Sequence, residues 1–174
     1  ALQFNNKFVG EVEKVMSSTK MGSTLLELEL TEGIIMDDAQ STIDALHQLK
    51  ALGISLSIDD FGTGYSSLSY LSRFPLDELK IDRSFVTGVN ENESDASLVI
   101  AIIAMGKGMN LELVAEGVET HEQYQFLTEH GANVIQGFLF SKPVPPEELR
   151  PLLSPGYFLS QVEDIETQLS QKDG

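Results

Sequence analysis

Two adjacent carboxylates and the glycine loop behind them are the most chemically informative part of this sequence. Asp59 and Asp60 end the alternating apolar run 54–58 and begin a loop with two glycines. Paired carboxylates at the C-terminal end of a buried parallel strand can hold a metal ion. They can also cap the following helix, because an Asp oxygen accepts hydrogen bonds from unpaired backbone N–H groups. Taken alone, this stretch favours the cap.

Four other predicted strands also carry a polar group near their C-terminal ends. These are Glu29 in the run 25–30, Lys80 in 79–82, Glu116 after 111–115 and Gln136 in 134–140. Each of these side chains, considered alone, could be a cap, a surface charge or half of an ion pair. Five strands with the same feature favour one shared site, because the C-terminal strand ends of a (β/α) barrel converge on one mouth.

The segments between the predicted strands have helical spacing or helix start and stop signals. Helices are predicted at 8–16, 37–53, 67–74, 94–108, 120–131 and 145–153. The centre of the fourth, 98–105, is apolar around most of its surface and is expected to be well buried. Strands that alternate with helices predict a parallel α/β fold. Residues 1–153 form one domain in this interpretation, and 154–174 form a tail that fits either an amphipathic helix or a frayed terminus.

The charge and the lack of cysteine narrow the possible ligands. The 174-residue chain has 27 acidic and 11 basic residues, a formal net charge of −16 and no cysteine. This charge weighs against binding to DNA, RNA or anionic membranes, which require basic patches. Without thiolates, a metal would be held mainly by oxygen ligands, which favour Mg²⁺ or Mn²⁺. The longest apolar run is far shorter than the roughly 20 residues of a membrane-spanning helix, and no signal peptide opens the sequence.

Carboxylates gathered at one mouth would repel each other unless cations neutralised them. Two divalent ions roughly 3.5–4 Å apart could bridge a phosphodiester and generate hydroxide for in-line attack. Lys80 would then be a positive partner for the nucleophilic water or for developing negative charge. A site of this kind could therefore serve metal-assisted hydrolysis of a phosphodiester.

Five motifs together resemble, in order and spacing, the EAL domain of cyclic di-GMP phosphodiesterases. They are Glu29-Leu30-Thr31-Glu32, the run 59–68, Leu79-Lys80-Ile81-Asp82, the run 115–119 and Gln136-Gly137-Phe138-Leu139-Phe140. The resemblance extends from about residue 1 to residue 153. It implies a TIM-type (β/α) barrel and a hydrolase of bacterial second-messenger signalling, which converts cyclic di-GMP to linear pGpG.

The resemblance also implies a role for each matching residue. Glu29, Asp59 and Asp60 would be metal ligands, with Asp59 bridging two ions. Lys80 would hold the attacking water, and Glu116 would be either a ligand of the second metal or the general base. Supporting positions are Glu32, Asp82, Glu119 and Gln136, and the loop that couples substrate, metal and dimerisation contains Phe61, Gly62, Thr63, Gly64, Tyr65 and Ser66.

This sequence has no match to the start of the family pattern, which contains the name-giving glutamate, an arginine and an asparagine. It supplies about five of the eight barrel strands. A complete barrel needs roughly 250 residues. The sequence is therefore interpreted as the C-terminal part of a phosphodiesterase domain, and alone it is expected to be weakly active or inactive. The alternative is a non-catalytic cyclic di-GMP receptor or interaction domain. The family further implies a homodimer, a preceding sensory or regulatory domain, and a cytoplasmic location, with any membrane anchor in other domains of the parent.

Overall fold

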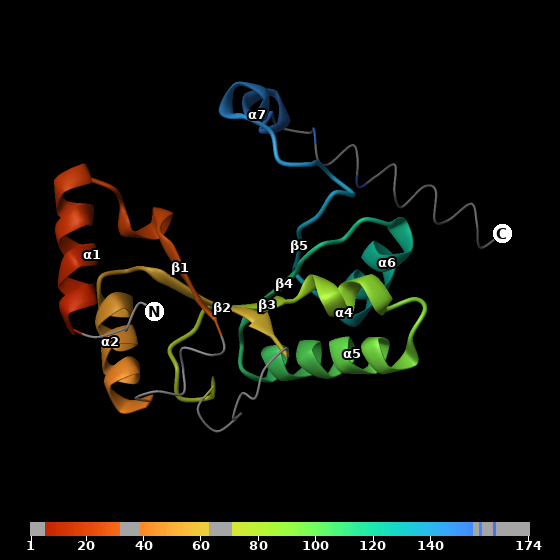
Figure 1. Ribbon diagram of the computed structural model, residues 1–174, viewed down its shortest axis with the longest axis horizontal. Coiled ribbons are helices and arrows are strands. Elements are labelled where there is room, and N and C mark those ends of the chain that lie inside the picture. Colours follow the sequence, from red (N-terminus) through yellow and green to blue (C-terminus); the bar gives the residue numbers. More distant parts are fainter. Residues whose placement is uncertain (1–5, 32–38, 63–70, 155–156, 158–161, 163–174) are drawn as a thin grey trace.

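Five parallel strands form one sheet in the computed structural model, which describes residues 6–31, 39–62, 71–154, 157 and 162 (Figure 1). The strands are β1 (Glu27–Thr31), β2 (Ser55–Phe61), β3 (Glu78–Ile81), β4 (Glu112–Ala115) and β5 (Val134–Ile135). Each pairs with the next in a parallel ladder, so the strand order follows the sequence. A doubly wound sheet reverses its order at a switch point, whereas a barrel wall continues in one direction. The order is that of an incomplete (β/α) barrel.

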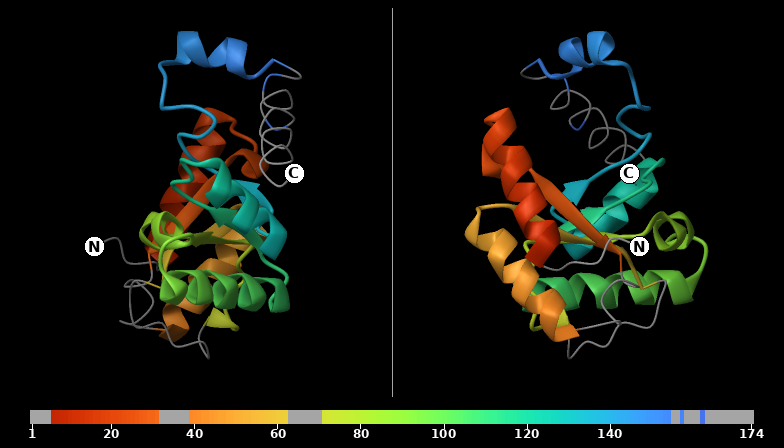
Figure 2. Two further views of the ribbon diagram at one scale, coloured as in Figure 1. Left: turned by 90° about the vertical axis from the view of Figure 1, so that its right-hand side faces the viewer. Right: turned by 60° about the vertical axis from the view of Figure 1, so that its left-hand side comes forward.

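The helices lie around the sheet in sequence order. They are α1 (Asn6–Thr19), α2 (Ala39–Ala51), α4 (Arg83–Gly88), α5 (Glu93–Gly108), α6 (His121–His130) and α7 (Pro146–Leu152). Helices α1 and α2 lie at the end of the sheet that begins with β1, and α4, α5 and α6 lie toward the end that finishes with β5 (Figure 1). Helix α7 stands away from the sheet in every view (Figure 2). Among the described residues, no helix combines the length and hydropathy needed to cross a bilayer.

Alternation along the strands separates an apolar face from a polar one. Leu56, Ile58 and Leu79 are fully buried and share one core with Leu46 of α2 and Ile103 of α5. The alternate positions of the same strands are mostly polar: Glu27, Glu29, Ser55, Ser57, Asp59, Glu78, Lys80 and Glu112. Because helices cover the apolar face, the polar face is the inner face of the barrel wall, and its C-terminal end forms the mouth.

The last strand is shorter than the sequence predicts. A strand over 134–140 is expected, but β5 ends at Ile135. The N–H of Gln136 still donates to the Ala115 carbonyl at 2.9 Å, yet the next residue, Gly137, lies against Val118, whose carbonyl oxygen would be 2.0 Å from an added Cβ. The chain then turns, and the N–H of Leu139 donates to the Val118 carbonyl at 3.0 Å. Contact with the distant loop 116–118 therefore ends the strand.

Helix α5 is buried on one side only, so the prediction that it is well buried is wrong. Val99 and Ile102 face the core, whereas Leu98 and Ile100 are 37% and 39% exposed. A helix outside a barrel wall has one side against the sheet, and its apolar composition does not change that geometry. The helix also begins earlier than predicted, because the Asn92 side chain caps it.

Other differences concern the ends of elements. Residues 23–25 form a 3₁₀ turn, so β1 begins at Glu27 and not at Leu25. Helix α4 was not predicted from the sequence, although Asp82 is a suitable N-cap for it. The predicted cap at Asp37 and Asp38 and the first part of the helix at 67–74 lie outside the described residues.

Asp77 links α2 to the sheet through hydrogen bonds to Lys50 of α2 and Leu56 of β2. Both of its carboxylate oxygens lie 2.7 Å from Lys50 Nζ, and Oδ2 also accepts from the Leu56 N–H at 2.8 Å. The ion pair is partly exposed and contributes little by itself, so the backbone bond is the larger contribution. We expect Asp77→Ala to lower the free energy of unfolding by about 1–3 kcal/mol in urea titrations. Glu129→Ala, which removes an exposed carboxylate from α6, is the control, and an equal effect of the two changes would contradict this account.

Glu78 makes the stability of the fold depend on pH. Burial, followed by repulsion from Glu27 and Glu112, raises the pKa of Glu78 from 4.5 to about 7, while Lys80 acts in the opposite direction and Glu29 adds to the rise. Because the folded protein holds this proton more tightly than the unfolded chain, the free energy of unfolding should fall as pH rises from about 4.5 to about 7.

The test is the change Glu78→Gln, which removes the titrating group. Because solvent screens this partly exposed carboxyl, we expect the change to raise the free energy of unfolding at pH 8 by only about 1 kcal/mol, and to have little effect below pH 4.5. Urea titrations across this pH range measure the difference. An unchanged pH profile would show that Glu78 does not titrate in this way.

Candidate active site

Lys80 lies at the centre of the polar mouth. Its Nζ is 2.7 Å from Oε1 of Glu29, 2.7 Å from Oε1 of Glu116 and 3.6 Å from Oδ1 of Asp59. Burial alone would lower the pKa of Lys80, but hydrogen bonds to Glu116 and Glu29 raise it above its usual value. Lys80 is therefore charged at neutral pH, and it lies among carboxylates from β1, from β2 and from the residue that follows β4.

A β-bulge explains how both adjacent carboxylates reach the mouth. Successive side chains of a regular strand point to opposite faces, so Asp59 and Asp60 could not both face the site. The pairing of β2 with β3 shifts by one residue between Ile58 and Phe61. Asp60 has a φ of 53°, a left-handed conformation that costs a non-glycine residue about 1–2 kcal/mol. The bulge therefore re-aims this pair of carboxylates, which is a common use of bulges near functional sites.

Asp60 and Asp82 form a second carboxylate contact at the mouth. Repulsion from Asp59, then burial and Asp82, raises the pKa of Asp60. Burial acts to raise the pKa of Asp82, but hydrogen bonds from Ser84 lower it below its usual value. Asp82 is the N-cap of α4 and accepts from the Ser84 N–H at 3.0 Å. The mouth thus concentrates more negative charge than Lys80 alone neutralises.

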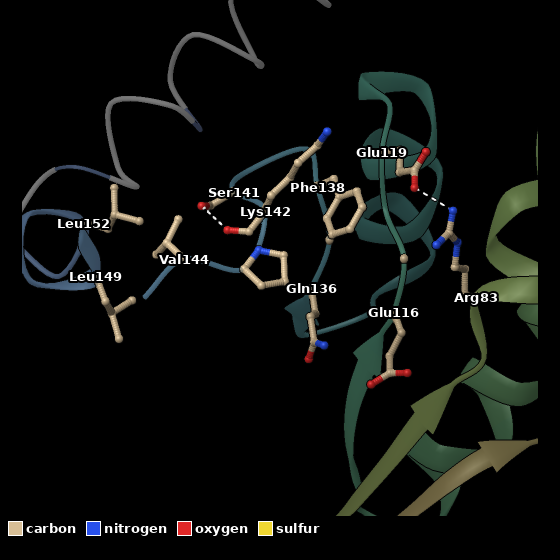
Figure 3. A pocket seen from close by; sticks show the side chains of 13 residues that line it. Arg83, Glu116, Glu119, Gln136, Phe138, Ser141, Lys142, Val144, Leu149 and Leu152 are labelled. Atoms are coloured by element: carbon tan, nitrogen blue, oxygen red, sulfur yellow. Dashed lines mark hydrogen bonds and ion pairs between the residues drawn. The ribbon is translucent and has the colours of Figure 1, made fainter. Parts of the chain in front are cut away.

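A cavity of about 530 Å³ opens beside Glu116 (Figure 3). The Glu116 carboxylate and the Gln136 amide project to the same side of it, as the close view shows. Phe138 is 47% exposed on the rim, with Lys142 Nζ 5.7 Å from the centre of its ring. The wall opposite the strands includes Leu149 of α7. The cavity therefore joins the carboxylate cluster to an exposed aromatic ring.

The side chains at the mouth fit a divalent cation by their chemistry. Oδ1 of Asp59 is buried without a hydrogen bond, although Lys80 lies nearby, so one carboxylate oxygen has no donor. The neighbouring donors are all carboxylate oxygens, which suit Mg²⁺ or Mn²⁺. Among the described residues, no group of three or more His, Asp or Glu side chains is arranged so that it could hold a metal ion. Glu29 and Glu116 turn instead toward Lys80, which acts as their counterion.

Most of the predicted site residues come together at this mouth. Glu29, Asp59, Lys80 and Glu116 are in one cluster, and Asp60 and Asp82 adjoin it. Glu119 and Gln136 line the cavity beside the cluster. Phe61 is buried, and Gly62, with a φ of 98°, lies against the Phe85 ring. Glu32, Thr63, Gly64, Tyr65 and Ser66 lie outside the described residues, so their predicted roles stay predictions.

Three features of the site were missed in the sequence. The bulge at Asp59 and Asp60 could have been suspected, because adjacent acids can share one face only if the strand is irregular. Arg83 follows the capping Asp82 and was not singled out, although it lines the cavity and pairs with Glu119. Phe138 was assigned to a strand and is instead part of the rim. Nothing in the sequence around Phe138 predicts that its ring is exposed.

Comparisons with known proteins place the chain in a family. Residues 2–143 match the EAL domain. The bifunctional diguanylate cyclase/cyclic di-GMP phosphodiesterase MucR of Pseudomonas aeruginosa is 48% identical over 150 residues, which cover 86% of this chain and 22% of MucR. The chain therefore belongs to the EAL domain family. It spans about a fifth of the length of the curated relatives MucR (22%) and NbdA of Pseudomonas aeruginosa (18%), which it matches.

Solved structures agree with this assignment. The MucR phosphodiesterase in complex with cyclic di-GMP superposes with a TM-score of 0.80 at 48% identity, covering 85% of this chain and 60% of that one. Klebsiella pneumoniae BlrP1, solved with manganese and cyclic di-GMP, gives 0.72 at 32% identity, covering 80% and 36%. The predicted family and the incomplete barrel are confirmed. The division into a domain at 1–153 and a tail stays a prediction.

Proposed function

We propose that this chain is the C-terminal part of a metal-dependent phosphodiesterase domain that opens one phosphodiester of cyclic di-GMP to give pGpG. The observation that carries the proposal is the convergence of Glu29, Asp59 and Glu116 on the buried Lys80. A cluster of this kind combines ligands for hard cations with a fixed positive charge, both of which phosphodiester hydrolysis uses. The relatives named above support the choice of substrate.

In this proposal the carboxylates hold two divalent cations, Mg²⁺ or Mn²⁺. Glu29, Asp59 and Asp60 are the residues that would hold them. When bound, such a pair of cations neutralises phosphate charge and makes water more acidic. The bulge in β2 brings Asp60 to the same side as Asp59, and the repulsion that raises the pKa of Asp60 would be relieved by a cation.

Lys80 and Glu116 have separate tasks at the reacting atoms. Lys80 stays protonated, so it cannot act as a base near neutral pH, and we assign it to orienting the attacking water through an N–H donor. Glu116 has one of two tasks: it accepts a proton from that water, or it would give an oxygen ligand to the second cation. Hydrogen bonding to Lys80 keeps the Glu116 carboxylate oriented toward the water.

The cavity beside Glu116 would receive part of the dinucleotide. Its volume of about 530 Å³ is within the range of small-ligand pockets. The exposed ring of Phe138 offers a face on which a purine base can stack, and Lys142 adds a positive charge at the rim. By resemblance to the family, the proposal also includes a homodimer, a cytoplasmic location and a sensory or regulatory domain in the parent protein.

The test uses the natural protein at its full length. We expect chromatography to show conversion of cyclic di-GMP to pGpG with Mn²⁺ or Mg²⁺ and no conversion in EDTA. The rival function is a cyclic di-GMP receptor, which would leave the dinucleotide intact while binding it in calorimetry. The same assay on residues 1–174 is expected to give weak turnover or none, and rates equal to the full-length protein would contradict that part of the proposal.

A further inference from the structure

We propose that Arg83 is a positioning residue of the reaction, acting through Glu119 and the loop 116–119 on the orientation of Glu116. This inference rests on the proposed phosphodiesterase function. Arg83 is the first residue of α4 and comes three positions after Lys80 in the chain. The C-terminal end of β3 therefore supplies Lys80 to the centre of the site, and the first residue of α4 supplies a second cation, Arg83, beside Glu119 at the cavity (Figure 3).

The Arg83 side chain is fitted closely to the loop. A Cβ added to Gly117 would be 2.2 Å from Arg83 Cγ and 2.7 Å from Cβ and Cδ, so the aliphatic stem lies directly on the Gly117 backbone. Gly117 has a φ of 69°, a conformation that side chains rarely adopt. Beyond the stem, Nη2 of Arg83 is 2.7 Å from Oε1 of Glu119. Arg83 thus contacts the loop at two successive points next to Glu116.

The backbone N–H groups at both ends of the same loop are hydrogen-bonded. The Glu116 N–H donates to the Ile81 carbonyl at 3.1 Å, and the Glu119 N–H donates to Oε1 of Gln123 at 2.8 Å. Between these anchors the side of the loop that faces α4 is covered by Arg83. Val118, the next residue, is held by its N–H bond to the Gln136 carbonyl at 3.1 Å and by the Leu139 N–H. Arg83 therefore covers the one side of Gly117 that these bonds leave open, and without it we expect a small shift of Gly117 that turns the Glu116 side chain.

The exposure of the ion pair between Arg83 and Glu119 indicates that the contact affects the reaction rate more than the stability of the fold. The side chains of Arg83 and Glu119 are 58% and 42% exposed, so solvent screens the pair and it adds little to stability. Displacement of a catalytic group by about 1 Å can nevertheless cost about 100-fold in rate. The contact should therefore affect turnover more than folding.

The test compares kinetics of the full-length protein and its variants with cyclic di-GMP and Mn²⁺. We expect Arg83→Ala to lower kcat roughly 10- to 100-fold, with KM changed less than about threefold. Arg83→Lys should recover most of the rate, because its stem can cover Gly117 and its ammonium can reach Glu119. Combining Arg83→Ala with Glu119→Gln should be no worse than the more damaging single change. Arg73→Ala, an exposed arginine paired with Gln40, is the matched control.

Amide hydrogen exchange tests the positioning role without turnover. In Arg83→Ala, the N–H groups of Glu119 and Thr120, which both donate to Gln123, should exchange about tenfold faster than in the control. Equal kinetics and equal exchange in Arg83→Ala and Arg73→Ala would overturn the inference, as would additive effects of Arg83 and Glu119. If the wild-type protein does not hydrolyse cyclic di-GMP, the proposed function fails, and the exchange data still decide whether Arg83 orders the loop.

Discussion

Changing Asp59 to asparagine is expected to lower cyclic di-GMP turnover by the full-length protein about 1,000-fold, which corresponds to about 4 kcal/mol of activation free energy. Asp59 sits on the bulge of β2, with Oδ1 buried and without a hydrogen bond. Within the described part of the chain, its oppositely charged neighbour is Lys80, whose Nζ lies 3.6 Å from Oδ1. Asparagine keeps the shape of the side chain and removes the charge, so the fold should survive while the shared cation ligand is lost.

Two measurements check this expectation. Turnover should fall, and the affinity for Mn²⁺ measured by calorimetry should fall with it, because both depend on the same carboxylate. Asp44→Asn changes an exposed aspartate of α2 and should leave both quantities unchanged. Wild-type turnover in the Asp59 variant would show that this carboxylate does not hold a required cation.

The second large effect is expected for Lys80→Ala, with kcat reduced at least about 1,000-fold. Lys80 is the counterion of Glu29 and Glu116, and its hydrogen bonds keep it protonated. Removing it deprives the attacking water of a fixed donor and leaves the carboxylates without their neighbouring positive charge. Lys80→Met retains most of the buried stem and should lose as much activity with less damage to packing.

The stability of the Lys80 variants supplies an independent readout. Without Lys80, the cluster of carboxylates should depend on bound cations, so Mn²⁺ should raise the melting temperature of Lys80→Met more than that of the wild type. Circular dichroism of both proteins in EDTA tests whether the fold persists. Normal turnover in Lys80→Met, or an equal response of both proteins to Mn²⁺, would contradict the assigned role.

The strands, and the residues that belong to the site, could be predicted because both follow from local sequence patterns. The alternation of Leu28 and Leu30 with Glu27 and Glu29 has the period of a strand, and the structure confirms β1 there. Parallel connections then place the ends of successive strands at one edge, so Glu29, Lys80 and Glu116 had to be neighbours once the fold class was known. The order of the five strands follows from the same rule.

The details that long-range packing decides were not predictable. The end of β5 at Ile135 depends on contact between Gly137 and Val118, which are 19 positions apart in the chain. The exposed side of α5 depends on the shape of the barrel wall and not on the apolar run itself. The adjacent acids Asp59 and Asp60 hint at an irregular strand, but the position of the bulge depends on pairing with β3. Each of these features reflects a contact whose partner the local sequence does not specify.

The most direct test of the central claim is hydrolysis of cyclic di-GMP in ¹⁸O-labelled water by the full-length protein with Mn²⁺. Water attack on one phosphodiester predicts pGpG as the product, with a single ¹⁸O atom in its terminal phosphate and no product in EDTA. Mass spectrometry reads both the product and the label. Cyclic di-GMP that binds but remains intact and unlabelled would contradict the account and leave the domain as a receptor.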